Sequence, residues 1–176
     1  RTFQPVCNTF KAVADLWCSS FFTAEDSRVT PEQYQLALAT LRNNGAFAKL
    51  LAEPWAAAAV GCARAADVRA FHWELEFPDV FFTLEQNPDF TFRRGFDAVI
   101  GNPPYDVLPE RETGHDLSAF KAYIEHEPLY APSRRGKNNL YKLFICRAID
   151  LLAENGRFGF IVPMALLGDD QAAELR

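Results

Sequence analysis

The sequence predicts an α/β fold in residues 71–176, preceded by a helical segment in residues 1–70. Two short segments, FDAVIG and RFGFIVP, are rich in β-branched and aromatic residues, which is typical of strands. Between them, NNLYKLFICRAIDLLAENG repeats apolar residues at helical spacing. The order strand, helix, strand favours parallel pairing through a right-handed crossover, so we expect both strands in one sheet.

Three helices are expected in the first segment. The first is amphipathic, because apolar residues recur at helical spacing and form a stripe with three aromatic rings: Phe10, Val13, Ala14, Trp17 and Phe21. We expect this aromatic stripe to be buried in the core. The second helix is expected to start at Thr30-Pro31, a threonine N-cap followed by proline, and to stop at Gly45. Pro54 begins the third, which is expected to continue through an alanine run to about Arg69.

The next two segments, FHWELEF and FDAVIG, are predicted to be strands of different kinds. FHWELEF, residues 71–77, has a period of two and predicts a strand with His72, Glu74 and Glu76 on its solvated face. FDAVIG, residues 96–101, lacks such a period and predicts a strand that is buried on both faces.

The remaining expected elements are three helices, and capping residues and glycine indicate where one of them starts and stops. A helix is expected around residues 118–125, within a polar stretch. The helix between the two strands has Asn138 or Asn139 as its cap and Gly156 as its stop. A further helix is expected near Ala165, after RFGFIVP.

The composition excludes several classes of protein. With 49% hydrophobic and 14% aromatic residues, the 176-residue chain can form a core and is not a disordered segment. No apolar run approaches the roughly 20 residues of a membrane helix, and no signal peptide opens the chain, so we expect a cytoplasmic protein. The four cysteines are scattered and the three histidines lack metal-ligand spacing, which predicts buried thiols and no metal site. Because the chain begins with Arg1 and ends within an expected helix, we expect it to be a piece of a longer protein.

The charge distribution is uneven. The net charge of −5 argues against a wholly basic nucleic-acid binder, but residues 128–149 contain no acid. This basic stripe carries five positive charges: Arg134, Arg135, Lys137, Lys142 and Arg147. Either it contacts phosphates or it is an ordinary solvated loop followed by a helix.

The loop after FDAVIG combines groups that suit one kind of ligand. Ligands of open α/β sheets bind beyond the carboxyl ends of strands, where Gly101 lets the backbone turn and approach a ligand closely. The Asn102 side-chain oxygen and the Pro103 carbonyl can both accept hydrogen bonds from one planar amino group. Two prolines, the second being Pro104, hold these acceptors in place, and Tyr105 offers a flat face for stacking. The loop therefore predicts a pocket for the exocyclic amine of an aromatic base.

Such an amine is a poor nucleophile because its lone pair is delocalised into the ring. Two acceptors on its protons would pull the nitrogen towards a pyramidal geometry and free that lone pair. They would also stabilise the positive charge that develops as the nitrogen attacks a methyl group. No strong general base is needed, which fits a motif without His or Glu.

The NPPY motif after an apolar strand resembles motif IV of S-adenosylmethionine-dependent amino-methyltransferases, specifically the adenine-N6 DNA group. HWELEFPDVF before the motif, and NLYKLFICRAIDLL and GRFGFIVP after it, resemble the large methylases of restriction–modification and phage-defence systems. The resemblance covers residues 71–167, which include motifs IV to VI. It implies a partial Rossmann-like methyltransferase sheet in residues 71–176 and site-specific transfer of a methyl group to the N6 amine of adenine.

The resemblance implies a role for each residue of the loop. Asn102 and Pro103 would accept hydrogen bonds from the adenine amine, Tyr105 would stack on the base, and Pro104 would keep the loop rigid. Gly101 and Asn102 would also lie near the methyl donor, S-adenosylmethionine.

Residues outside the loop receive roles as well. Phe144, in the segment that matches motif V, would line the pocket shared by cofactor and base. Arg134, Arg135 and Lys137 would face the phosphates of double-stranded DNA while the target adenine is flipped out of the stack.

The sequence departs from the family in one respect. The nine glycines include no G-x-G pair, so the glycine loop that binds the cofactor is missing, and the ribose-binding acid has no match. We therefore expect the remainder of a parent methylase as a partner, and an isolated chain without activity or measurable affinity for S-adenosylmethionine. In the family's sheet order FDAVIG lies between RFGFIVP and the first strand, which carries the glycine loop and has no match here. The resemblance thus implies that one apolar edge of FDAVIG lacks its neighbour, and we expect this edge to pair with FHWELEF or with a second copy of the chain. Protein-glutamine or RNA amino-methyltransferases, or a fragment that only folds or binds partners, are the alternatives.

Overall fold

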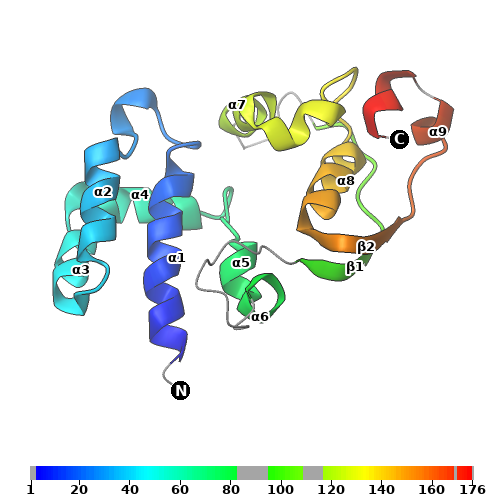
Figure 1. Cartoon of the computed structure of the whole chain (residues 1–176). Coiled ribbons are helices and arrows are strands. Elements are labelled where there is room, and N and C mark those ends of the chain that lie inside the picture. The colour runs from blue at the N-terminus through cyan, green and yellow to red at the C-terminus, as the bar shows by residue number, and fades with distance from the viewer. Residues whose placement is uncertain (1–2, 83–94, 109–116, 169, 176) are drawn as a thin grey trace. The chain divides into compact units, whose positions relative to one another are not determined.

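The computed structural model describes residues 3–82, 95–108, 117–168 and 170–175. The chain forms two compact units, residues 1–76 with 118–120 and residues 77–117 with 121–176 (Figure 1). The described residues of the first unit form helices, whereas the second unit holds two strands as well as helices. None of the described helices has both the length and the hydropathy needed to cross a membrane.

The first unit has a core of small and branched side chains. Its helices are α1 (Phe3–Ser19), η1 (Glu25–Ser27), α2 (Pro31–Thr40), α3 (Asn44–Leu51), α4 (Pro54–Arg64) and α5 (Trp73–Glu76). The buried face of α4 consists of alanines, and α1 packs against this helix. The core residues are Ala12, Val13, Leu16, Ala37, Phe47, Leu50, Ala56 and Ala59.

The expected helix starts are confirmed. Thr30 and Gln33 form a capping box, in which the Gln33 N–H donates to the Thr30 hydroxyl at 3.2 Å and the Thr30 N–H to the Gln33 side chain at 2.9 Å. Pro54 is the first residue of α4. These signals are local, because each depends only on residues within one turn.

The expected helix ends are wrong at two places. Gly45 does not stop α2, which ends at Thr40, but lies in the first turn of α3. Asn43 caps α3 by accepting the Ala46 N–H at 3.1 Å, so a new helix starts where a stop was expected. The third helix ends at Arg64 rather than near residue 69, because Ala65 has an extended backbone with ψ 153°.

The aromatic stripe of α1 is not the buried face. Val13 is buried, but Phe10 is 45% and Trp17 is 56% exposed. Trp17 lies against the Tyr34 ring, with centroids 5.4 Å apart. Because α1 packs on the alanine face of α4, the smaller residues of α1, including Ala12, occupy the interface.

The strand expected at FHWELEF is a helical turn, α5. The His72 carbonyl accepts the N–H groups of Leu75 and Glu76, both at 2.9 Å. The His72 and Glu76 side chains are not merely solvated, because both bind residues of α1. His72 Nε2 lies 2.8 Å from Asp15 Oδ1, and the Lys11 ammonium lies 2.7 Å from Glu76 Oε1. FHWELEF therefore does not pair with FDAVIG as expected.

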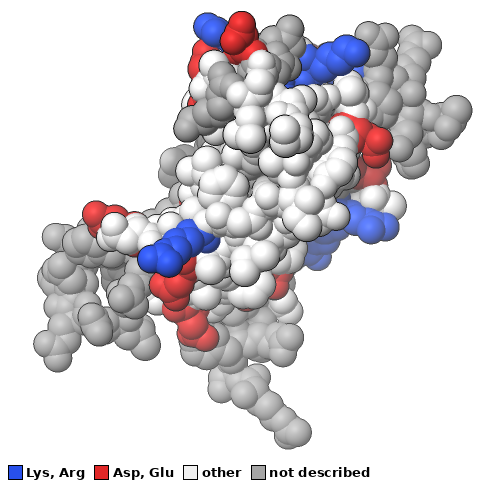
Figure 2. Space-filling model, turned by 90° about the vertical axis from the view of Figure 1, so that its right-hand side faces the viewer, with Lys and Arg blue, Asp and Glu red and all other residues white. Residues whose placement is uncertain are grey.

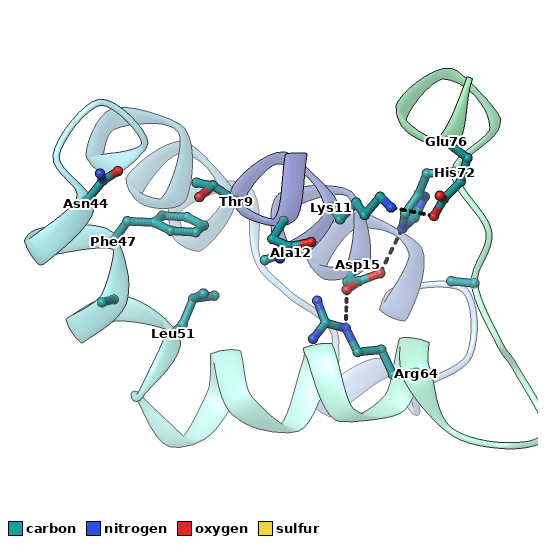
Figure 3. A pocket seen from close by; sticks show the side chains of 13 residues that line it. Thr9, Lys11, Ala12, Asp15, Asn44, Phe47, Leu51, Arg64, His72 and Glu76 are labelled. Atoms are coloured by element: carbon teal, nitrogen blue, oxygen red, sulfur yellow. Dashed lines mark hydrogen bonds and ion pairs between the residues drawn. The ribbon is translucent and has the colours of Figure 1, made fainter. Parts of the chain in front are cut away.

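Asp15 joins three segments of the first unit (Figure 3). It is 3% exposed and accepts hydrogen bonds from Arg64 at 2.7 Å and from His72. The hydrogen bond to Asp15 is the main cause that raises the pKa of His72 from 6.5 to about 9; Cys18 adds to this and burial opposes it. His72 is thus protonated at neutral pH, and its pair with Asp15 is a charged one.

We expect this ion pair to make the stability of the chain depend on pH. The pKa of His72 is higher in the folded than in the unfolded state, so its contribution is complete below pH 6.5 and is lost as the pH rises through about 9. A shift of this size corresponds to on the order of 3 kcal/mol. Urea unfolding should show that the free energy of unfolding of the wild type declines between pH 6 and pH 9.5. His72→Gln keeps a hydrogen-bond donor but does not titrate, so its free energy of unfolding should not show this decline. Equal pH dependence of the two proteins would contradict the assignment.

The second unit contains a parallel strand pair. β1 (Phe96–Gly101) pairs with β2 (Leu152–Phe160), and α8 (Leu140–Leu151) connects them, so the parallel pairing is confirmed. The other elements of this unit are α6 (Pro78–Phe81), most of α7 (Ser118–His126), η2 (Pro128–Ser133), α9 (Ala165–Gly168) and η3 (Asp170–Leu175). Two expected helices, around residues 118–125 and near Ala165, are confirmed as α7 and α9.

The second strand begins earlier than expected. α8 ends at Leu151 instead of at Gly156, and Asn139 is its N-cap residue. β2 then contains extra residues opposite β1: Phe96 aligns with Leu152, but Ala98 aligns with Arg157. This irregularity places residues 153–156 inside the strand, where a helix end was expected.

β1 is not buried on both faces in the described residues. Ile100 of β1 is 84% exposed, and Ile161, just after β2, is 67% exposed. α8 packs on both strands. Among the described residues β1 pairs with β2 alone. The expected pairing with FHWELEF is therefore wrong, and pairing with a second copy of the chain stays a prediction.

A candidate active site after the first strand

The NPPY loop follows β1 directly, as expected. Gly101 ends β1, and its carbonyl accepts the Ile161 N–H at 3.1 Å, which continues the hydrogen bonding beyond β2. Pro103 is buried, whereas Asn102 and Tyr105 are exposed. The buried Pro103 anchors the loop, while the Asn102 and Tyr105 side chains remain accessible.

The Tyr105 hydroxyl closes the loop. Its oxygen lies 2.8 Å from Asn102 Oδ1 and 3.2 Å from the Ile161 carbonyl oxygen. The first and last residues of the motif are thus joined to each other and to the chain after β2. No residue type in the sequence indicates this link, because the partner at Ile161 is a backbone carbonyl, which every residue has.

The chain leaving the loop is held by the start of α8. The Leu108 N–H donates to the Asn138 carbonyl, and the Leu140 N–H donates to the Asp106 carbonyl, both at 2.8 Å. Leu108 is buried with Ile124 and other apolar side chains. The loop is therefore fixed at both ends, by β2 on one side and by α8 on the other.

Three residues of the basic stripe hold the fold together. Arg134 donates to the carbonyls of Ile124 at 3.2 Å and Glu127 at 2.7 Å, at the end of α7. Lys142 is 1% exposed and donates to a backbone carbonyl, that of residue 135, at 3.1 Å. Arg147 pairs with Asp150 at 2.9 Å. Most of the charge in this segment therefore binds protein groups.

Two residues of the stripe face solvent. Arg135 is exposed and forms an ion pair with Glu174 at 3.0 Å, on η3. Lys137 is exposed and forms no ion pair within the described residues. On the face drawn in Figure 2, basic and acidic side chains are interspersed around a wide area without charge. Contact with DNA remains a prediction for Arg134, Arg135 and Lys137.

Two residues predicted to lie near the cofactor, Gly101 and Phe144, are described in the structure. A Cβ atom at Gly101 would lie 3.3 Å from the Phe160 ring, a tight contact that a small shift of this ring would have to relieve. Phe144 is 48% exposed on α8, and its role in a cofactor pocket remains a prediction. Among the described residues, no group of three or more His, Cys, Asp or Glu side chains could hold a metal ion.

A separate pocket of about 680 Å³ lies within the first unit, between α1, α3, α4 and the segment around His72 (Figure 3). Its charged side chains bind one another: Lys11 pairs with Glu76, and Asp15 pairs with Arg64 and His72. These pairs link α1 to α4 and α5, which indicates a structural role for them.

Comparison with known proteins finds a matching family. The model of the Eco57I restriction-modification methylase family matches residues 15–176 of this chain. The chain is 30% identical over 95 residues to the Type II methyltransferase M.AccI of Acinetobacter calcoaceticus, covering 54% of this chain and 16% of that protein. It is 35% identical over 86 residues to the Type II methyltransferase M.TthHB8I of Thermus thermophilus, covering 46% and 19%.

The chain spans less than a fifth of the length of these two relatives. No solved structure matches it. The resemblance to restriction–modification methylases is confirmed by the family match, which covers the strand pair, the NPPY loop and most of the helical segment. The chain belongs to the Eco57I restriction-modification methylase family.

Proposed function

We propose that this chain carries the catalytic loop of a DNA methyltransferase that transfers a methyl group from S-adenosylmethionine to the N6 amine of adenine. The observation that carries the proposal is the NPPY loop, which lies at the carboxyl end of a parallel strand with Asn102 and Tyr105 exposed. Membership in a restriction–modification methylase family favours DNA over the protein-glutamine and RNA alternatives.

Each residue of the loop has a distinct task in this proposal. The Asn102 side-chain oxygen and the Pro103 carbonyl accept the two protons of the flipped adenine amine, and Tyr105 stacks on the base. The acceptors strengthen their hydrogen bonds as positive charge develops on the nitrogen, so they stabilise the transition state more than the bound substrate. The buried Pro103 and the adjoining Pro104 keep these groups in position.

The cofactor would supply the methyl group, and the described residues fit its reactive end only. Gly101 and Asn102 lie at the loop where the methyl group must arrive. The chain has no G-x-G glycine pair for the rest of the cofactor. We therefore assign binding of the nucleoside part to the remainder of a parent methylase, and expect the isolated chain to be inactive. We also propose that β1, which pairs with β2 alone among the described strands, pairs on its other side with a strand of that remainder or with a second copy.

The proposal is tested with the full-length protein that contains this chain. The purified protein is incubated with DNA and S-adenosylmethionine carrying a labelled methyl group, and the DNA is digested to nucleosides for mass spectrometry. We expect the label in N6-methyladenine. Label in methylcytosine, in protein or in RNA, or no transfer at all, would refute the proposed function.

Within the basic stripe we expect Lys137 to contribute most clearly to DNA binding. Its ammonium is exposed and has no ion pair within the described residues, whereas Arg134 would have to give up two hydrogen bonds to reach a phosphate. Lys137→Ala should lower the slope of log affinity against log salt by about one unit. The measurement is fluorescence anisotropy of labelled DNA at several salt concentrations.

Arg134→Ala is the matched comparison. It removes the same charge but also frees the carbonyls at the end of α7, so it should lower the melting temperature and change the salt slope less than Lys137→Ala does. Arg135→Ala should have an intermediate effect, because this guanidinium is exposed but paired with Glu174. An unchanged slope for Lys137→Ala would remove this residue from the DNA interface.

A further inference from the structure

The Tyr105 hydroxyl lies between two acceptors. It is 2.8 Å from Asn102 Oδ1 and 3.2 Å from the Ile161 carbonyl oxygen. A hydroxyl has one proton, so it makes one full hydrogen bond at a time, and the shorter distance favours Asn102. The proposed stacking function uses the ring of Tyr105 and gives the hydroxyl no task.

The Asn102 side chain needs such a partner because its two ends are similar in shape and opposite in chemistry. The oxygen can accept a proton from an amine, whereas the NH₂ group can only donate. Half a turn of the carboxamide exchanges them. A donor beside the oxygen selects the orientation in which the acceptor is held in place, and no other side-chain hydrogen bond to Asn102 is present among the described residues.

The hydrogen bond leaves Asn102 able to bind substrate. A carbonyl oxygen has two lone pairs, so Oδ1 can accept from the Tyr105 hydroxyl and still accept from an incoming amine. The Ile161 carbonyl restrains the hydroxyl from the other side, and the Ile161 N–H is itself bound to Gly101. The hydroxyl therefore shares its one proton unequally between two oxygens, of which Asn102 Oδ1 is the nearer and the Ile161 carbonyl the alternative acceptor.

We propose that Tyr105 is a positioning residue for Asn102: its hydroxyl orients the carboxamide so that the oxygen is presented to the substrate amine. The inference rests on the proposed function and adds a task for the hydroxyl that is independent of the stacking ring. The aromatic face and the amide acceptor are then oriented as one unit, which reduces the reorganisation required when the base arrives.

Tyr105→Phe separates the two tasks, because it keeps the ring and removes the hydroxyl. In the full-length protein we expect kcat to fall by about 3- to 10-fold, the range of a single hydrogen bond. The KM for DNA and the fluorescence of 2-aminopurine placed at the target base should not change, since the ring still stacks. In an Asn102→Ala background the same substitution should have no further effect on kcat, because the hydroxyl acts through Asn102.

Tyr34→Phe is the control, as it removes a hydroxyl from the helical unit and should leave kcat unchanged. Wild-type kcat for Tyr105→Phe, or an equal loss in the presence and absence of Asn102, would overturn the proposal. So would a drop in melting temperature that accounts for the lost activity.

A second measurement does not depend on activity. In the 176-residue chain with ¹⁵N-labelled asparagine, the side-chain NH₂ signals of Asn102 should shift and broaden in Tyr105→Phe, because both orientations become populated. Unchanged signals would overturn the contact itself. An inactive wild-type protein would instead refute the proposed function, and the NMR comparison would still decide whether the hydroxyl orients the amide.

Discussion

Asn102→Ala is expected to lower the kcat of the full-length methylase by about 100- to 1,000-fold, the effect of removing one acceptor or donor that acts on a transition state. The side-chain oxygen of Asn102 is one of only two acceptors assigned to the amine, and its interaction strengthens as the nitrogen becomes positive. DNA binding should persist, because Tyr105 and the phosphate contacts are unaffected. Methyl transfer under single-turnover conditions and anisotropy of labelled DNA measure the two effects separately.

Asn44→Ala is the matched control, since it removes an asparagine side chain from α3, in the helical unit. It should leave both kcat and DNA affinity unchanged. A wild-type rate of methyl transfer for Asn102→Ala would show that Asn102 does not assist the reaction. Equal losses of DNA affinity and kcat would mean that the residue binds substrate without favouring the transition state.

Gly95→Ala is expected to destabilise the strand pair more than alanine at the three glycines within the strands, Gly101, Gly156 and Gly159. A Cβ atom at Gly95 would lie 2.5 Å from the Ala153 nitrogen and 2.5 Å from the Leu152 carbonyl carbon, both of which are backbone atoms. Neither can move without displacing the start of β2, so we expect a loss of about 3 kcal/mol or more, at the upper end of overpacking effects. Urea unfolding of the 176-residue chain gives this value.

Gly159→Ala is a suitable control because it lies in β2 and a Cβ atom there would have no neighbour within 4 Å. Its stability should remain within about 0.5–1 kcal/mol of the wild type. Gly156→Ala should fall between the two, since its Cβ would approach backbone oxygens at 2.9 Å. Similar losses for Gly95→Ala and Gly159→Ala would show that the close approach at residue 95 is not what the fold requires.

Signals that act within a few residues were sufficient to predict several elements. The capping box at Thr30, the proline at residue 54 and the helix at residues 118–126 all appear where the sequence indicates them. The parallel pairing also follows from the order of elements, since two neighbouring strands joined through a helix pair in parallel by a right-handed crossover. For the candidate site, the sequence by itself identified an accessible loop with Asn102 and Tyr105 at the end of β1.

Interactions between distant segments decided the rest. FHWELEF has the period of a strand, but His72 binds Asp15, 57 positions earlier, and the segment forms a helical turn instead. Arg134 and Lys137 are both positive residues of one short basic segment, and the sequence does not distinguish them. In the structure Arg134 binds the end of α7, whereas Lys137 faces solvent. The Tyr105 hydroxyl meets the Ile161 carbonyl across 56 positions. Periodicity and charge describe a residue and its neighbours, whereas hydrogen-bond partners depend on which segments the fold brings together; these contacts therefore became visible only in the tertiary structure.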